Sequence, residues 1–246
     1  MKASDTTIRT LTSKLKPKTL SPLVVIVGET ASGKSRLAID LAKRFNGEII
    51  CADSRTVYKG LDIGTAKPTA AEQRKIKHHL LDIVTPDQPF NVAQFKKLAE
   101  EAIRDISSRG RLPIMVGGTG LYVDSVLFDY KFSSKKSERD PLNPRHLKDA
   151  PESRNNIREN TLVMGLSIDR ENLNKRINIR VANMMKKGLV NEVKNLSKRY
   201  GWDAPGLQTI GYKEFKNKLD NKDLLTQLTA EIERNTSLYA KRQRTW

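Results

Sequence analysis

Short apolar runs alternate with amphipathic segments along the first half of the chain. The continuous apolar run 23–27 is typical of a strand buried on both faces of a parallel sheet, and 48–52 and 112–116 predict two further strands. The segment 34–45 has a helical pattern, and 91–108 predicts a second helix, capped by its first residue and with apolar side chains at a period of 3.6. Strands that alternate with helices predict an α/β fold with a parallel sheet flanked by helices.

The remaining segments suggest a tail, an interruption and one more strand. Residues 1–22 are polar and basic, and we expect a disordered basic tail there. Residues 131–160 are rich in Ser, Pro, Asn and charge and predict an irregular linker, after which 161–168 predicts a strand. We therefore expect a single α/β domain over 23–246.

Two long helices are predicted in the C-terminal part, over 170–200 and 222–245. The first carries an apolar stripe typical of a buried helix face, made of Leu173, Ile177, Val181, Met184 and Gly188. A neighbouring polar stripe is mostly basic and consists of Arg176, Arg180, Asn183 and Lys187. This second stripe is either a solvated face or an anion-binding one.

Composition adds a polyanionic partner to this outline. The chain has 246 residues with 45 Lys and Arg against 28 Asp and Glu, a formal net charge of +17. Nine basic and two acidic side chains fall within 170–200. Such an uneven excess favours nucleic acid as a partner, although a generally basic surface would have the same composition.

Other features exclude several classes of protein. The sequence has no apolar run of about 18 residues, so we expect no membrane partner. The N-terminal residues lack the apolar segment of a secretion signal, and the single cysteine, Cys51, excludes a disulfide framework and a Cys-based zinc site. These observations predict a cytoplasmic protein.

A complete phosphate-binding motif follows the first strand. Gly28 to Ser35 reads GETASGKS and fits G-x-x-x-x-G-K-[ST] between a predicted strand and a predicted helix. Its glycines allow backbone amides to surround an anion, Lys34 supplies a positive charge, and the Ser35 hydroxyl is a ligand for Mg²⁺. The motif indicates a phosphate chain with a metal, but it does not by itself indicate ATP.

The signals expected of a nucleotide hydrolase or a small-molecule kinase are missing. Strand 112–116 is followed by Gly117-Gly118-Thr119 and by no acidic residue, and the sequence has no arginine-rich lid. Asp53, just after strand 48–52, is the carboxylate best placed to face the ligand crevice of a parallel sheet. It is a candidate metal ligand or general base, or simply a turn residue.

Several segments together resemble the tRNA dimethylallyltransferases, also called tRNA isopentenyltransferases. Besides GETASGKS they are, in chain order, 52–58 (ADSRTVY), 62–68 (DIGTAKP), 78–83 (HHLLDI), 90–95 (FNVAQF), 117–122 (GGTGLY), 211–214 (GYKE) and 240–246 (AKRQRTW). They cover roughly 23–130 and 160–246. The resemblance implies a P-loop-type sheet whose C-terminal helices complete the substrate channel.

The resemblance also implies a reaction. A dimethylallyl group moves from dimethylallyl diphosphate to the exocyclic amine of the adenosine 3′ of the anticodon in tRNA, and diphosphate leaves. Residues of the loop would bind the diphosphate: Gly28, Glu29, Thr30, Ala31, Ser32, Gly33, Lys34 and Ser35. Lys34, Thr30 and Mg²⁺ held by Ser35 would stabilise the leaving group, while Asp53 would take the proton of the amine.

The resemblance further implies that the anticodon stem-loop of tRNA is bound by a monomeric enzyme. The target base must leave the stacked loop to reach the diphosphate. The candidate RNA contacts are Asp53, Ser54, Arg55, Thr56, Thr119, Arg176, Arg180, Lys241, Arg242, Gln243 and Arg244. For His78 and His79 a structural role or a phosphate contact is expected, and not catalysis.

The chain departs from the family pattern in the part that grips RNA. The family commonly has a helical insertion between GGTGLY and the long basic helices, and the 131–160 linker stands in its place. His146 and Asp149 stand where arginines are usual, and Thr56 where Gln is common. Ser237 and Leu238 also differ from the usual residues, which implies the loss of a basic contact near the diphosphate, and the family usually continues beyond Trp246.

Three other functions remain open from the sequence. One is an isopentenyltransferase that uses a free adenine nucleotide, against which the +17 charge argues. The second is a nucleic-acid-binding P-loop protein without catalysis, which would have no need of Lys34, Ser35 and Asp53 together. The third is a small-molecule kinase.

Overall fold

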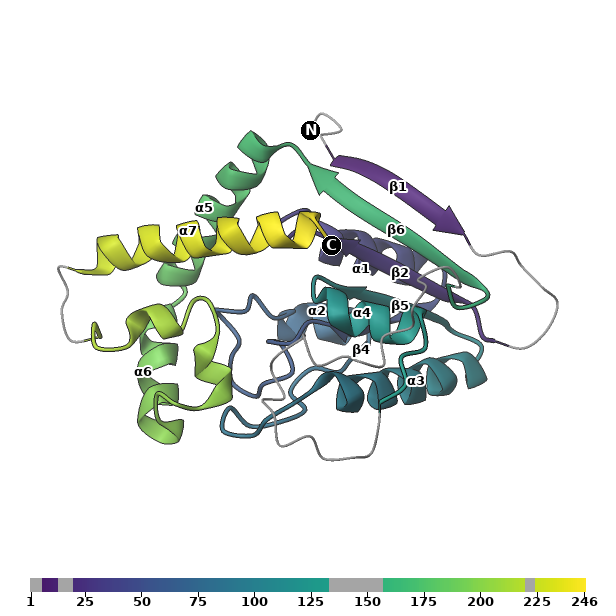
Figure 1. Ribbon diagram of the computed structural model, residues 1–246, viewed down its shortest axis with the longest axis horizontal. Coiled ribbons are helices and arrows are strands. Elements are labelled where there is room, and N and C mark those ends of the chain that lie inside the picture. The colour runs from purple at the N-terminus through teal and green to yellow at the C-terminus, as the bar shows by residue number, and fades with distance from the viewer. Residues whose placement is uncertain (1–5, 13–19, 133–156, 220–223) are drawn as a thin grey trace.

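A six-stranded sheet forms the centre of the molecule (Figure 1). The computed structural model describes residues 6–12, 20–132, 157–219 and 224–246. The strands are β1 (Thr6–Thr12), β2 (Leu23–Gly28), β3 (Gly47–Ala52), β4 (His78–His79), β5 (Leu112–Gly117) and β6 (Thr161–Ile168), in the order β1-β6-β2-β5-β3-β4. All neighbours are parallel except β1, which pairs antiparallel with β6 at one edge. The predicted α/β fold with a parallel sheet is confirmed.

The N-terminal strand corrects one prediction. Residues 6–12 were expected to belong to a disordered tail. Instead all seven pair with β6, from Thr6 opposite Ile168 to Thr12 opposite Leu162. Four of these seven residues are threonine and one is isoleucine, and β-branched residues favour strands. The exposed edge of β6 supplies the partner that the local sequence could not show.

Helices cover both faces of the sheet (Figure 1). In the first half they are α1 (Lys34–Arg44), α2 (Ala70–Lys75), α3 (Val92–Ser108) and α4 (Gly120–Leu127). Asn91 begins α3 as predicted, in a capping box in which its side chain accepts a hydrogen bond from the backbone amide of Gln94. The short helices α2 and α4 were not predicted.

The predicted helix 170–200 is in fact two helices. They are α5 (Arg170–Lys186) and α6 (Leu189–Tyr200), and the chain turns between them at Gly188, where φ is 95°. Glycine adopts this left-handed conformation without strain, so it ends one helix and begins the next, and it does not continue the apolar stripe. The last predicted helix is confirmed as α7 (Leu225–Arg244), which packs against α5 (Figure 1). Two short 3₁₀ helices, Pro205–Gln208 and Lys213–Phe215, lie between α6 and α7.

The hydrophobic core is divided by the sheet. A smaller cluster joins α1 to one face, with Ala38 and Ala42 against Ile49 and Ile114. A larger one joins the other face to α3, α4 and the C-terminal helices. The other members of the predicted apolar stripe are buried there, namely Leu173, Ile177, Val181 and Met184.

Most of the predicted linker, namely residues 133–156, lies outside the described residues. No helix among the residues described is long and apolar enough to span a membrane.

Candidate active site

The loop 28–35, which has the predicted phosphate-binding motif, joins the end of β2 to the start of α1. Gly28 and Gly33 have φ values of 140° and 101°, and a Cβ on Gly28 would lie only 2.2 Å from the carbonyl oxygen of Leu166. Both glycines are therefore required by the backbone. Gly33 is the N-cap of α1, so the positive end of the helix dipole points at the loop.

Lys34 is the first residue of α1 and its amine lies within the loop. The Lys34 Nζ donates a hydrogen bond to the Glu29 carbonyl oxygen at 2.5 Å. Burial lowers the pKa of Lys34 to about 8, an effect that nearby Arg180 increases and that Asp53 and Glu29 oppose. Among the residues that the structure describes, the amine forms no ion pair, and a bound anion would supply its partner.

A cavity of about 290 Å³ lies against this loop, and we call it the P-loop cavity. Its lining includes Thr30, Ala31, Gly33, Lys34, Ser35, Cys51, Asp53, Thr56, Thr65, Ala66, Pro68, His78, Gly117, Gly118, Arg180, Tyr239 and Gln243. The structure thus brings Lys34, Ser35 and Asp53 together, as predicted. They meet because β2, β3 and β5 all end at the same edge of the sheet.

A second cavity, of about 250 Å³, adjoins the first, and we call it the distal cavity. Its lining includes Thr30, Asp53, Arg55, Gly64, Thr65, Arg180, Gln208, Thr209, Ile210, Gly211, Lys213, Thr236, Tyr239 and Arg242. Five residues line both cavities: Thr30, Asp53, Thr65, Arg180 and Tyr239. Two ligands bound in the two cavities would therefore meet at these side chains.

The five shared residues form a wall between the two cavities, which we call the common wall. Asp53 is held in this wall by its own turn. Its Oδ1 accepts a hydrogen bond from the backbone amide of Arg55 at 2.8 Å. The next residue, Ser54, donates its backbone amide to the hydroxyl of Thr119 at 3.0 Å, which links this turn to the GGTGLY segment. Asp53 is therefore a turn residue that also lines both cavities, so its place in the turn does not exclude a role in the site.

Arg180, a member of the predicted basic stripe, lines both cavities. Its Nη2 donates to the Thr65 carbonyl oxygen at 3.0 Å, and its guanidinium lies between the two cavities. Burial lowers its pKa and Asp53 opposes this change, but a guanidinium remains charged in proteins. The P-loop cavity is therefore lined by two cations, Lys34 and Arg180.

The C-terminal helix closes the loop from the other side. The Gln243 side chain accepts a hydrogen bond from the Thr30 amide at 2.7 Å and donates one to the Gly118 carbonyl oxygen at 2.9 Å. Gln243 therefore joins the segments that follow β2 and β5, and it also lines the P-loop cavity.

The basic residues of α7 take different positions. Arg244 forms an ion pair with the buried carboxylate of Glu29 and donates to the Ile168 carbonyl oxygen at 2.7 Å. These contacts lie beside another hollow, and neither Glu29 nor Arg244 lines the P-loop cavity. Arg242 lines the distal cavity, whereas Lys241 is exposed and lines neither.

The remaining predicted contacts lie near the loop. Arg176 lies beside it, 3.5 Å from the Ser32 carbonyl oxygen. Thr56 is buried in the wall of the P-loop cavity. Cys51 lies there too, and burial raises the pKa of its thiol to about 12, so it stays protonated and unreactive.

The two histidines have different environments. His78 lines the P-loop cavity, its Nδ1 lies 2.8 Å from the Ile76 carbonyl oxygen, and burial lowers its pKa. His79 contacts the buried Glu48 at 2.7 Å, which is the structural role expected. Within the described ranges no three His, Cys, Asp or Glu residues lie close enough to hold a metal. A magnesium ion at Ser35 would need its other ligands from diphosphate and water.

Four further residues line the cavities although no motif assigns them to the site, namely Thr65, Lys213, Thr236 and Tyr239. Thr65 and Lys213 belong to the DIGTAKP and GYKE segments, which were noticed without a role being assigned. Tyr239 and Thr236 lie on α7 beside the substituted positions 237 and 238, and nothing in the local pattern marks them as lining a cavity.

The parallel sheet, the phosphate-binding loop and the carboxylate at the sheet edge define an α/β protein of the P-loop type. Comparison with known proteins narrows this class. The model of the family described as IPP transferase matches residues 56–157 and 141–246. The chain belongs to the IPP transferase family.

Individual relatives agree along nearly the whole chain. It is 41% identical to the tRNA dimethylallyltransferase of Anoxybacillus flavithermus, over 91% of this chain and 86% of that protein. The solved structure of the full-length tRNA isopentenylpyrophosphate transferase from Bacillus halodurans matches with a TM-score of 0.77 and 37% identity, over 92% of this chain and 86% of that one. A eukaryotic dimethylallyltransferase acting on tRNA matches with a TM-score of 0.80 and 30% identity, over 92% of this chain and 70% of that one.

Proposed function

We propose that this protein is a tRNA dimethylallyltransferase. It transfers the dimethylallyl group of dimethylallyl diphosphate to the exocyclic amine of the adenosine 3′ of the anticodon and releases diphosphate. The observation that carries the proposal is the common wall of the two cavities, where Asp53 lies with Arg180 and next to Lys34 of the P-loop cavity. The names of the relatives, which describe the same activity, support it.

The P-loop cavity binds the diphosphate in this proposal. Negative charge grows on the leaving oxygen as the C–O bond of the prenyl group breaks. Lys34, Arg180 and the amides of the loop are fixed in place before the reaction, so they stabilise that charge without reorganising. The hydroxyl of Thr30 is available to the same oxygens, because Thr30 lines both cavities.

Asp53 acts on the other substrate. The lone pair of the adenine amine is delocalised into the ring, so the amine is a weak nucleophile. A carboxylate that accepts its hydrogen orients the amine and takes its proton as the new C–N bond forms. Asp53 faces both cavities, as this role requires.

The distal cavity receives the flipped adenosine. Its basic residues Arg55, Lys213 and Arg242 are available to the flanking phosphates, and Tyr239 and Arg180 lie where the base meets the prenyl group. The predicted RNA roles of Ser54, Thr56 and Thr119 are positioning roles in this arrangement, because these residues support the Asp53 turn.

Magnesium fits the loop when the substrate contributes to its coordination. The Ser35 hydroxyl lies in the cavity wall, and the diphosphate would supply further oxygen ligands. When bound, the ion would neutralise charge on the leaving diphosphate.

Relatives have residues that this chain lacks. The alignment with the Anoxybacillus protein spans 268 positions, more than the 246 residues of the chain. The two matches to the family model overlap at residues 141–157, which supports a missing insertion there. We therefore propose that this enzyme binds the anticodon stem-loop through its general basic surface. We also propose that it acts in the cytoplasm as a monomer.

The test offers radiolabelled dimethylallyl diphosphate together with unmodified tRNA or AMP, and labelled ATP with small acceptors. Label from the prenyl donor should enter tRNA alone. Label in AMP would indicate the free-nucleotide enzyme, phosphoryl transfer from ATP a kinase, and no transfer at all a binding protein. Asp53→Asn should retain dimethylallyl diphosphate binding and lower turnover by about 10²-fold or more. Near-normal turnover of that variant would remove the general-base role.

A further inference from the structure

The loop 61–68, which contains the DIGTAKP segment, forms a wall of both cavities. Thr65 faces both of them, Ala66 and Pro68 face the P-loop cavity, and Gly64 faces the distal cavity. The carbonyl oxygen of Thr65 also accepts the hydrogen bond that orients Arg180. The position of this loop therefore sets the shape of the common wall and the place of one of its cations.

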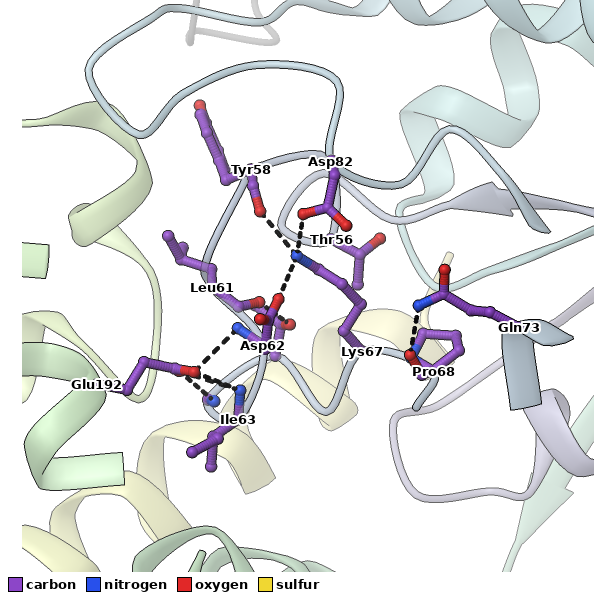
Figure 2. Close-up of polar contacts among 12 residues, drawn as sticks. Thr56, Tyr58, Leu61, Asp62, Ile63, Lys67, Pro68, Gln73, Asp82 and Glu192 are labelled. Carbon is purple, nitrogen blue, oxygen red and sulfur yellow. Dashed lines mark hydrogen bonds and ion pairs between the residues drawn. The ribbon is translucent and has the colours of Figure 1, made fainter. Parts of the chain in front are cut away.

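One end of the loop is fixed by Lys67 (Figure 2). Its buried ammonium donates to the Tyr58 carbonyl oxygen at 2.9 Å and to the carboxylates of Asp62 and Asp82, each at 2.6 Å. The contact with Asp62 closes the loop on itself, because Lys67 and Asp62 lie near its two ends. The contacts with Tyr58 and Asp82 join this end of the loop to neighbouring segments.

Glu192 of α6 holds the loop from outside. Its two carboxylate oxygens accept hydrogen bonds from three consecutive backbone amides, those of Asp62, Ile63 and Gly64, at 2.9 to 3.2 Å (Figure 2). An ionised carboxylate that receives several amide hydrogens makes stronger bonds than a neutral acceptor. The residues joined lie about 130 positions apart in the chain.

Tyr212 completes the contact from the GYKE segment. Its hydroxyl donates to Glu192 Oε1 at 2.6 Å and accepts from the Gly64 amide at 3.1 Å. Its ring is fully buried and lies so close to Gly64 that a Cβ there would be 2.4 Å from it. Glu192 and Tyr212 therefore fix both the distance and the rotation of the loop.

A continuous path connects this contact to the reacting groups. Glu192 binds the amides of residues 62–64, the next residue, Thr65, binds Arg180 through its carbonyl oxygen, and Arg180 lies beside Asp53 at the common wall. Neither Glu192 nor the hydroxyl of Tyr212 lines either cavity. Glu192 is therefore joined to the cavities through the 61–68 loop, to which it is hydrogen-bonded.

We propose that Glu192 and Tyr212 are positioning residues for prenyl transfer, which hold the 61–68 loop so that Arg180 and the common wall match the transition state. This inference rests on the proposed function. The diphosphate is bound mainly by the loop 28–35, which Glu192 does not touch, so loss of the contact should lower kcat more than it raises the KM for dimethylallyl diphosphate. Misplacement of a reacting group by about 1 Å can cost about 10²-fold in rate.

The experiment compares Glu192→Gln, Tyr212→Phe and the double variant with the unaltered protein. Glu192→Gln keeps the size of the side chain but presents an amide NH₂ to backbone donors, and Tyr212→Phe removes only the hydroxyl. We expect Glu192→Gln to lower kcat by about 10- to 100-fold, with a change in KM for dimethylallyl diphosphate below about 3-fold. The double variant should lose less than the product of the two single losses, because both residues hold the same loop.

The matched control is Glu171→Gln, since Glu171 is an exposed glutamate of the neighbouring helix whose ion pair is with Lys175. It should leave kcat unchanged. Amide hydrogen exchange at residues 62–64 should become faster in Glu192→Gln and stay unchanged in the control. Rates are divided by the folded fraction, measured by near-UV circular dichroism.

Three results would overturn the inference. They are an unchanged kcat in Glu192→Gln, a loss that disappears once the folded fraction is taken into account, and a loss confined to the KM for dimethylallyl diphosphate. Failure of the proposed function would look different, because the unaltered protein would then form no prenylated tRNA at all. In that case faster amide exchange at 62–64 would still report whether Glu192 holds the loop.

Discussion

The buried amine of Lys34 should make the ligand-free protein less stable than it would be with an apolar side chain. Its pKa falls from 10.5 to about 8, chiefly because of burial. At about 1.4 kcal/mol per pKa unit, holding the proton on this amine at pH 7 opposes folding by on the order of 3 kcal/mol. Lys34→Met removes this penalty, and it also removes the hydrogen bond to the Glu29 carbonyl, which contributes about 1 kcal/mol.

The variant should therefore be more stable than the unaltered protein by roughly 2 kcal/mol at pH 7, which corresponds to a rise of about 5 °C in Tm for a chain of this size. The difference should depend on pH in a defined direction. Between pH 8 and 10.5 the unfolded chain binds a proton at Lys34 that the folded protein has released, so the stability of the unaltered protein rises and the advantage of the variant is lost. Near pH 10.5 the variant should be the less stable protein, by about the 1 kcal/mol of the missing hydrogen bond.

Differential scanning calorimetry at pH 7, 9 and 10.5 measures both effects, and titration calorimetry with dimethylallyl diphosphate should show that Lys34→Met no longer binds it. Lys43→Met is the control, because Lys43 lies exposed on the same helix and should change stability by less than about 0.5 kcal/mol. The reasoning would be refuted if Lys34→Met were less stable than the unaltered protein at pH 7. It would also be refuted if the variant were still the more stable protein at pH 10.5.

Three other predictions concern different parts of the molecule. Gly64→Ala should destabilise the protein by about 1–3 kcal/mol in urea unfolding, because its Cβ would meet the Tyr212 ring; unchanged stability would show that the ring moves freely. Arg109 lowers the pKa of Glu48 to about 2, so Glu48 contributes stability above its ordinary pKa that is lost as the pH falls toward 2; in Glu48→Gln, acid unfolding should show a shallower pH dependence in that range. Affinity for tRNA, measured by filter binding, should fall steeply between 50 and 200 mM salt, and Arg242→Gln should reduce the slope by about 1; a flat dependence would contradict phosphate contacts.

Local patterns predicted those parts of the fold that local physics determines. The apolar run 23–27, the glycine loop and the capping residue Asn91 each specify their own conformation, and the structure confirms all three. The strand at 6–12 and the turn at Gly188 were missed. The strand depends on an edge of β6 that lies about 150 residues away, and a glycine within a helical pattern ends a helix only where packing allows the chain to turn.

In the candidate site, too, the residues indicated by local patterns were predicted and the contacts between distant segments were not. Lys34, Ser35 and Asp53 were named because motifs and strand ends indicate them, and the structure places them around one cavity. The hydrogen bonds that orient Arg180 and Gln243 were not predicted, because their partners are carbonyl and amide groups of distant loops. A backbone group carries no signal in the sequence, so contacts of this kind cannot be predicted from residue types.

The hydrogen bond between the Thr30 amide and Gln243 has a consequence for the synthesis of the protein. The two residues are 213 positions apart, so the phosphate-binding loop is translated long before the helix that completes it. Until Gln243 is in place, the Thr30 amide and the Gly118 carbonyl oxygen lack these two hydrogen bonds. We therefore expect the loop 28–35 to reach its final geometry only after α7 has docked against it.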